Sequence, residues 1–92
     1  MLNKEICIIN KVGLHARPAA KMVQECKKLN CKVEIEKLGK RADAKSITAI
    51  MQLGVKFNEC INVYIQGNDE TEEKKALAKI ESLVEDKFGE RE

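Results

Sequence analysis

The chain has 92 residues, and its 17 basic and 15 acidic side chains leave a formal net charge of +2. This length suits one small domain with a single core and excludes a second lobe. Because no run of residues is polybasic and aromatic residues make up only 3% of the chain, a nucleic-acid partner is not expected.

The first half of the chain predicts a strand, a helix and a hairpin. An apolar strand over residues 6–9 is followed by a loop and by an amphipathic helix over residues 16–29. Strict alternation predicts a strand at residues 32–37. A turn at Leu38-Gly39 then returns a short antiparallel partner over residues 40–44.

The second half predicts a helix, a strand and a helix. A two-turn helix follows Ser46 and stops at Gly54. Residues 60–66 alternate strictly and form the clearest strand of the chain. The last helix begins at Asp69 in a capping-box pattern, and the tail at residues 90–92 is expected to fray. The apolar stripe expected on this helix consists of Leu77, Ile80, Leu83, Val84 and Phe88.

The order of these elements indicates the fold class. The predicted order is strand, helix, strand, strand, helix, strand, helix. Its most economical packing is one four-stranded antiparallel sheet covered on one face by three helices. We therefore expect an α+β open-faced β-sandwich that spans residues 1–92 as one domain. The polar face of its sheet would stay in contact with water.

The cysteines are Cys7, Cys26, Cys31 and Cys60, and they lack both a CxxC pair and the spacing of a zinc module. The apolar part of the N-terminal segment is too short for a signal peptide, and no membrane span is present. We therefore expect a protein of the reducing cytoplasm with four free thiols, most of them packed in the core and Cys31 exposed. Neither a metal nor a cofactor is expected.

The only histidine and the only proline lie together in Gly13-Leu14-His15-Ala16-Arg17-Pro18-Ala19-Ala20. Pro18 has no backbone N–H and suits a first helical turn, so the helix begins close to His15. Unpaired amides at a helix start can receive an anion, and Arg17 adds a fork of donors. Because a neutral imidazole is a nucleophile, this junction suits a phosphoryl group carried on His15. Residue chemistry alone also permits an ordinary surface residue or helix cap.

This segment resembles the active-centre signature of the HPr family, the histidine-containing phosphocarriers of the phosphoenolpyruvate-dependent phosphotransferase system. A second segment, Lys45-Ser46-Ile47 with Met51-Gln52-Leu53-Gly54-Val55, is similar to the family's regulatory-serine region. The resemblance implies the βαββαβα architecture and a phosphorylated intermediate rather than a stand-alone enzyme. It implies that His15 accepts a phosphoryl group from Enzyme I as pros-phosphohistidine and passes it to Enzyme IIA domains.

The same resemblance implies roles for four other residues. Arg17 would be the electrostatic partner of the phosphoryl group, and Ser46 the site of regulatory phosphorylation by an HPr kinase/phosphorylase. Ile47 and Met51 would form part of an apolar docking surface. Residue chemistry alone also explains Ser46 as an ordinary helix N-cap. The implied setting is sugar transport by a cytoplasmic monomer.

Several alternatives stay open. Val12 stands where many members have a polar side chain, and Thr48 replaces a frequently apolar residue. Residues 10–13 resemble the nitrogen-regulatory branch of the family, whereas Pro18 fits the sugar-transport branch. A regulatory or adaptor module acting through Ser46 and the apolar surface is one rival class. A small ferredoxin-like enzyme or ligand-binding domain is another, although the sequence offers no motif for an acid/base pair or a deep pocket.

Overall fold

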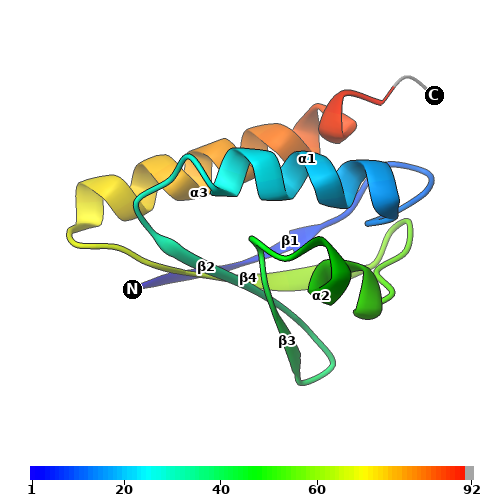
Figure 1. Ribbon diagram of the computed structural model, residues 1–92, viewed down its shortest axis with the longest axis horizontal. Helices are drawn as coiled ribbons and strands as arrows, with labels where there is room; N and C mark the ends of the chain where they lie inside the picture. Colours follow the sequence, from blue (N-terminus) through cyan, green and yellow to red (C-terminus); the bar gives the residue numbers. More distant parts are fainter. Residues whose placement is uncertain (91–92) are drawn as a thin grey trace.

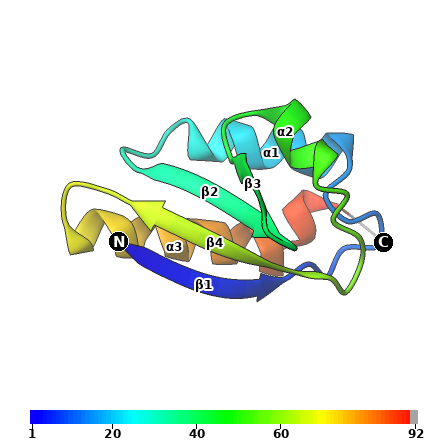
Figure 2. The ribbon, with the colours of Figure 1, turned by 90° about the horizontal axis from the view of Figure 1, so that it is seen from below.

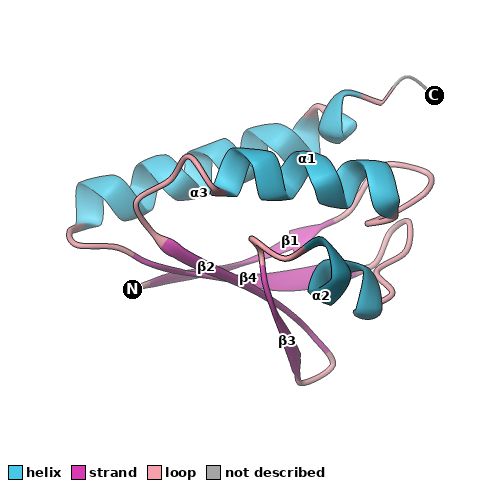
Figure 3. Cartoon of the chain, in the orientation of Figure 1, coloured by secondary structure: helices cyan, strands magenta, loops and turns pink. Residues whose placement is uncertain are grey.

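The molecule has two layers, with the two long helices on one side and a sheet on the other (Figure 1, Figure 3). The computed structural model describes residues 1–90 of the chain. The elements are β1 (Leu2–Cys7), α1 (Ala16–Cys26), β2 (Lys32–Lys37), β3 (Lys40–Asp43), α2 (Ile47–Gln52), β4 (Cys60–Gln66), α3 (Glu70–Glu85) and the 3-10 turn η1 (Lys87–Gly89). Apart from η1, this is the expected order, and the open-faced β-sandwich is confirmed.

The sheet is antiparallel throughout, and its strands lie in the order β1-β4-β2-β3 (Figure 2). From the central strand β4, Ile61, Val63 and Ile65 point into the core, as the alternation predicted. α1 and α3 lie side by side over this inner face, and α2 packs against α1 and β3. The outer face is polar, and on it the Tyr64 hydroxyl donates a hydrogen bond to Glu36 (2.8 Å).

The core lies between the two layers, and every helix and strand contributes at least one buried apolar side chain. The largest fully buried apolar side chains are those of Ile8, Met22, Ile35, Ile50, Ile61, Ile65 and Ile80. Each such side chain stabilises the fold by roughly 1.5–3 kcal/mol. The core therefore fixes how the helices sit on the sheet. Within residues 1–90, no helix is both long enough and apolar enough to span a membrane.

Two elements near the N-terminus differ from the sequence-based expectation. β1 covers Leu2–Cys7 instead of residues 6–9, because this edge strand pairs with β4 along its whole length and buries only Ile6. Charged side chains are well tolerated on such an edge. α1 ends at Cys26 rather than at residue 29, because its last turn tightens, with the amide of Leu29 bonded to the carbonyl of Cys26 (3.0 Å).

The C-terminal segment follows the prediction in most respects. Asp69 is the N-cap of α3 and accepts a backbone hydrogen bond from its first turn (2.8 Å). In the expected apolar stripe Leu77 is only half-buried, and Phe88 is buried but lies in η1, where the backbone leaves the α-helix. Glu90 accepts a side-chain hydrogen bond (2.8 Å) from the loop before α1, so the tail does not fray at this residue. Residues 91–92 of the expected frayed tail lie outside the described residues.

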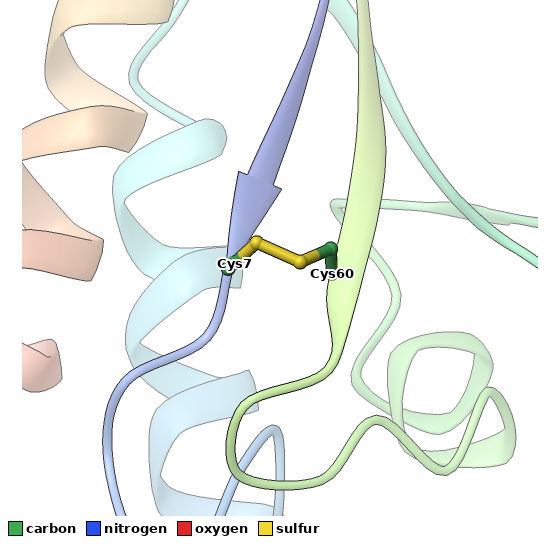
Figure 4. Close-up of a disulfide and its surroundings, with 2 residues drawn as sticks. All are labelled: Cys7 and Cys60. Atoms are coloured by element: carbon green, nitrogen blue, oxygen red, sulfur yellow. A yellow bond between two sulfur atoms is a disulfide. The ribbon is translucent and has the colours of Figure 1, made fainter.

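The expectation of four free thiols is wrong, because a disulfide joins Cys7 and Cys60 (Figure 4). Cys7 ends β1 and Cys60 begins β4, and the two residues are directly opposite each other in the sheet. Both are exposed, and only the register of the folded sheet brings them together across a sequence separation of 53. Cys26 and Cys31 are free thiols and both are buried, so Cys31 is not exposed as expected.

Candidate functional site

His15 is the N-cap residue of α1, at the strand-to-helix junction predicted from the sequence. Its backbone is extended (φ −80°, ψ −170°), and its carbonyl accepts the first hydrogen bond of the helix from the amide of Ala19 (2.9 Å). The side chain is exposed and makes no capping hydrogen bond. The amides of residues 16 and 17 have no partner within the helix. An imidazole open to solvent therefore lies beside donors that suit an anion.

Arg17 and Pro18 follow His15 on the first turn of α1. Pro18 is buried at the third helical position, where its missing N–H breaks no helical hydrogen bond. Arg17 is exposed at the second position, and the structure gives it no hydrogen bond or ion pair with residues 1–90. Its guanidinium can therefore serve as a donor to a group bound at the helix start.

The loop that presents His15 is docked on the loop after α2. The amide of Leu14 donates a hydrogen bond to the carbonyl of Val55 (2.9 Å). Gly13 has φ +65°, and a Cβ at this position would lie 2.3 Å from the same carbonyl oxygen. Glycine is therefore required here both by its backbone conformation and by the close approach of the two loops. This contact fixes the backbone one residue before the imidazole.

The buried side chain of Asn10 also stabilises this loop. Its side chain is fully buried, and its Nδ2 donates hydrogen bonds to the carbonyl of Gly13 (2.7 Å) and to Oε1 of Glu90 (2.8 Å). Its Oδ1 has no hydrogen-bond partner among residues 1–90. Asn10 was not among the site residues predicted from the sequence, because nothing in the sequence showed that this amide would be buried.

A hollow of about 170 Å³ lies beside His15. Its lining residues are Val12, Leu14, His15, Met51, Gly54, Val55 and Lys56. His15 and Met51, predicted from separate motifs, thus share one surface, whereas Arg17, Ser46 and Ile47 do not line it. Lys56 is the only cation among these lining residues, and sequence reasoning missed it because its position depends on the contact between the loops.

Exposed apolar side chains line this hollow or are near its lining residues in the chain. Val12 and Met51 line it with 55% and 37% of their surfaces exposed. Ile47 is 41% exposed and lies one turn before Met51 on the same face of α2. Phe57 is 49% exposed and follows Lys56 in the chain. We call Val12, Ile47, Met51 and Phe57 the apolar surface. Its two α2 members, Ile47 and Met51, are the docking residues that the family resemblance implied.

Ser46 is the N-cap of α2, as expected from residue chemistry. Its hydroxyl oxygen accepts a hydrogen bond from the amide of Ala49 (3.3 Å), and the residue is half-buried. The cap alone accounts for a serine at this position. A regulatory role for Ser46 stays a prediction.

The loop after α2 is fastened to the end of β2 by an ion pair that the sequence did not reveal. Lys37 donates hydrogen bonds to the carbonyl of Gly54 (2.9 Å) and to Oε1 of Glu59 (2.8 Å). The backbone amide of Lys56 donates to the same carboxylate (2.7 Å). The hydrogen bond from Lys37 and that amide lower the pKa of Glu59 below its ordinary value. Among residues 1–90, no group of three or more His, Cys, Asp or Glu side chains could hold a metal ion.

Comparison of sequences connects this geometry with known proteins. The family model for the PTS HPr component phosphorylation site matches residues 2–86. The phosphocarrier protein HPr of Cupriavidus necator is 37% identical over 92 residues, which are the whole of both chains. The HPr-like protein Crh of Halalkalibacterium halodurans is 42% identical over 77 residues, which cover 84% of this chain and 92% of that protein.

Solved structures show the same fold. The crystal structure of HPr-C-His from Thermoanaerobacter tengcongensis has a TM-score of 0.85 and 44% identity, with both chains fully covered. An HPr dimer from the same organism has a TM-score of 0.66 and 46% identity, and the match covers 98% of this chain and 100% of that chain. With a family match over residues 2–86 and an exposed histidine at the start of α1, the chain belongs to the HPr family of the phosphotransferase system.

Proposed function

We propose that this protein carries phosphoryl groups within the phosphoenolpyruvate-dependent phosphotransferase system, accepting them on His15 from Enzyme I and donating them to Enzyme IIA domains. The observation that carries this proposal is the exposed His15 imidazole at the N-cap of α1, which makes no capping hydrogen bond. Family membership supplies the class of reaction. The protein would be a phosphorylated intermediate rather than a stand-alone enzyme, and it would serve sugar transport.

The transfer step uses the lone pair of the His15 Nδ1 atom. This atom forms a bond to phosphorus while the bond between phosphorus and the donor atom of Enzyme I breaks, which leaves pros-phosphohistidine on the carrier. The free amides at the start of α1 and the Arg17 guanidinium then donate charge-assisted hydrogen bonds to the phosphoryl oxygens. Donation to Enzyme IIA reverses this step, with the acceptor atom of Enzyme IIA taking the phosphorus.

Both partners would dock on the apolar surface around the hollow. Val12 and Met51 line the hollow beside His15, so a partner seated there brings its reacting atom close to the imidazole. Burial of exposed apolar side chains favours such association. Lys56 would pair with an acidic group of the partner and set its orientation.

Phosphorylation with Enzyme I and phosphoenolpyruvate tests the proposal. We expect one adduct per chain, stable in base and labile in acid, mapped to His15 by mass spectrometry. His15→Ala should abolish the adduct without loss of folding, since the side chain is exposed and makes no hydrogen bond with residues 1–90. Failure to form an adduct, or an adduct that persists in the variant, would overturn the assignment of His15.

A second candidate function is a regulatory or adaptor module that acts through Ser46 and the apolar surface, with His15 incidental. The similarity to the HPr-like protein Crh favours it. In either case we propose that Ser46 is phosphorylated by an HPr kinase/phosphorylase. The nitrogen-regulatory branch is a further form of this alternative. Enzyme I distinguishes the two functions, because only the carrier forms the adduct on His15.

We also propose that the chain works as one domain, over residues 1–92, and as a monomer in the cytoplasm. Its edge strand β1 is linked by the Cys7–Cys60 disulfide to β4 of the same chain, which supports a closed monomer. The HPr dimer of Thermoanaerobacter tengcongensis is a related protein in another state. Light scattering after size exclusion should give the mass of one chain; a doubled mass would contradict this proposal.

A further inference from the structure

We propose that Cys7 and Cys60 form a thiol–disulfide exchange site whose oxidation state sets how firmly the two loops around His15 are held together. The loop over residues 8–15 leaves β1 directly after Cys7, and the loop over residues 53–59 enters β4 directly before Cys60 (Figure 4). Where this inference concerns phosphoryl transfer, it rests on the proposed function. Its structural part concerns the loops alone.

A series of hydrogen bonds connects the disulfide with the site. The amide of Ile8 donates to the carbonyl of Glu59 (2.9 Å), and the amide of Asn58 donates to the carbonyl of Ile8 (2.8 Å). Further along both loops, the amide of Leu14 donates to the carbonyl of Val55 (2.9 Å). The disulfide is therefore a covalent link at one end of this series of hydrogen bonds between the loops. The other end of the series lies one residue before His15.

Because β1 is an edge strand, the hydrogen bonds between the two loops are sensitive to the loss of the disulfide. β1 has a hydrogen-bonded neighbour, β4, on one side only, and a single buried side chain, Ile6. Hydrogen bonds at the end of such a strand open locally at low cost. With the disulfide reduced, the end of β1 and the loop that follows it depend on these hydrogen bonds and on their own packing.

Exchange chemistry is confined to this pair. Cys7 and Cys60 are exposed, so a small thiol or disulfide reagent can reach their sulfur atoms. Cys26 and Cys31 are buried, and burial raises the pKa of Cys26 to about 11 and also raises the pKa of Cys31. Because the thiolate is the reactive form, these two thiols stay inert at neutral pH. In a reducing compartment, disulfides are commonly transient and redox-sensing rather than structural.

The exchange balances with a small-molecule disulfide such as glutathione disulfide as the oxidant. The thiolate of one cysteine attacks a glutathione sulfur, a mixed disulfide forms, and one glutathione thiolate leaves. The thiolate of the other cysteine then attacks the protein sulfur of the mixed disulfide and releases the second glutathione thiolate. Two electrons pass from the cysteines to glutathione disulfide, and the two thiol protons end on the released glutathione. Reduction by a small dithiol is the reverse exchange.

The experiment compares the full chain after treatment with glutathione disulfide and after treatment with dithiothreitol. Alkylation and peptide mapping determine the state of each cysteine, amide hydrogen exchange reports on the loops, and Enzyme I with phosphoenolpyruvate gives the rate of phosphoryl acceptance. On reduction, the amides of Leu14 and Asn58 should exchange roughly tenfold faster through local opening, while the amides of β3, at the far edge of the sheet, should show no change in local opening. Phosphoryl acceptance should slow roughly threefold or more.

The Cys7→Ser/Cys60→Ser variant is the matched control. It should behave like the reduced protein under both treatments; a redox effect that persists in it would overturn the inference. Equal loop exchange and equal acceptance in the two states of the natural chain would also overturn it, while the carrier proposal would stand. If no adduct forms in either state, the carrier proposal fails, and the exchange of Leu14 and Asn58 decides the structural inference alone.

Discussion

Asn10 is a buried amide that ties the loop before His15 to the C-terminal segment. In Asn10→Ala the carbonyl of Gly13 and the carboxylate of Glu90 lose this donor. We expect the free energy of unfolding, measured in urea, to fall by about 1–3 kcal/mol, because buried groups are left unsatisfied. Asn3→Ala removes an exposed asparagine of β1 and should change the free energy of unfolding by less than about 0.5 kcal/mol. Equal effects of the two variants would contradict this role.

Arg17 is expected to act on the reaction and not on the fold. Its side chain is exposed and has no hydrogen bond or ion pair with residues 1–90, so Arg17→Ala should change the free energy of unfolding by less than about 0.5 kcal/mol. Phosphoryl acceptance from Enzyme I should slow roughly tenfold or more, since a donor to the phosphoryl oxygens is lost. Arg17→Lys keeps the charge but loses the guanidinium fork. Its rate of phosphoryl acceptance should therefore lie between the rates of the natural chain and of Arg17→Ala. An unchanged rate in Arg17→Ala would remove the assigned role.

At the scale of elements, two variants at the start of α2 separate the N-cap role of Ser46 from its proposed regulatory role. Ser46→Ala removes the N-cap and should cost about 1 kcal/mol of stability while leaving phosphoryl acceptance near the natural rate. Ser46→Asp keeps a good N-cap and adds a negative charge close to Ile47. It should preserve thermal stability and impair acceptance from Enzyme I by repelling acidic groups of the docked partner. Undiminished acceptance in Ser46→Asp would argue against docking at α2.

Glu25 links the two long helices and makes the link sensitive to acid. Its buried carboxylate pairs with Lys79 of α3 (2.8 Å) and with Lys28 (3.0 Å), and these hydrogen bonds lower its pKa from 4.5 to about 2. A pKa lowered by folding contributes stability above the ordinary value, and this contribution is lost as the pH falls from 4.5 towards 2. Urea unfolding over this range should show a smaller loss of stability in Glu25→Gln than in the natural chain. Parallel pH profiles would contradict the link.

The elements that the sequence predicted best are those whose pattern of apolar and polar side chains reports which face is buried. β4 was predicted within its observed bounds because a central strand with one buried face alternates strictly. β1 was not, because an edge strand is held mainly by its backbone pairing, which side-chain patterns do not report. The end of α1 was missed because the last turn tightens after Cys26.

The candidate site likewise contains residues that a local sequence pattern predicted and residues that it did not. His15 and Pro18 were placed correctly, because a helix start leaves a local pattern in the sequence. Lys56 and Asn10 were missed as site residues, since their positions depend on a contact between two loops that are far apart in the chain. The Cys7–Cys60 pairing was missed because a reducing compartment was expected and because only the register of β1 on β4 places the two cysteines opposite each other.

For the molecule as a whole, the disulfide should be a large contributor to stability. It closes a loop with a sequence separation of 53, for which chain entropy alone gives about 4 kcal/mol. Urea unfolding with and without dithiothreitol should show a loss of about 2–4 kcal/mol on reduction. The Cys7→Ser/Cys60→Ser variant should show no effect of the reductant, and an equal response in that variant would point to another cause.

The same cross-link turns most of the chain into a covalent ring. Residues 7–60 form this ring, and it contains His15, Ser46 and the whole apolar surface, whereas α3 lies outside it. Leu38, in the hairpin within the ring, is 91% exposed and is a natural point of attack for a protease. A single cut at this turn would open the ring without releasing a fragment, so the nicked protein would stay in one piece until its sulfur bridge is reduced.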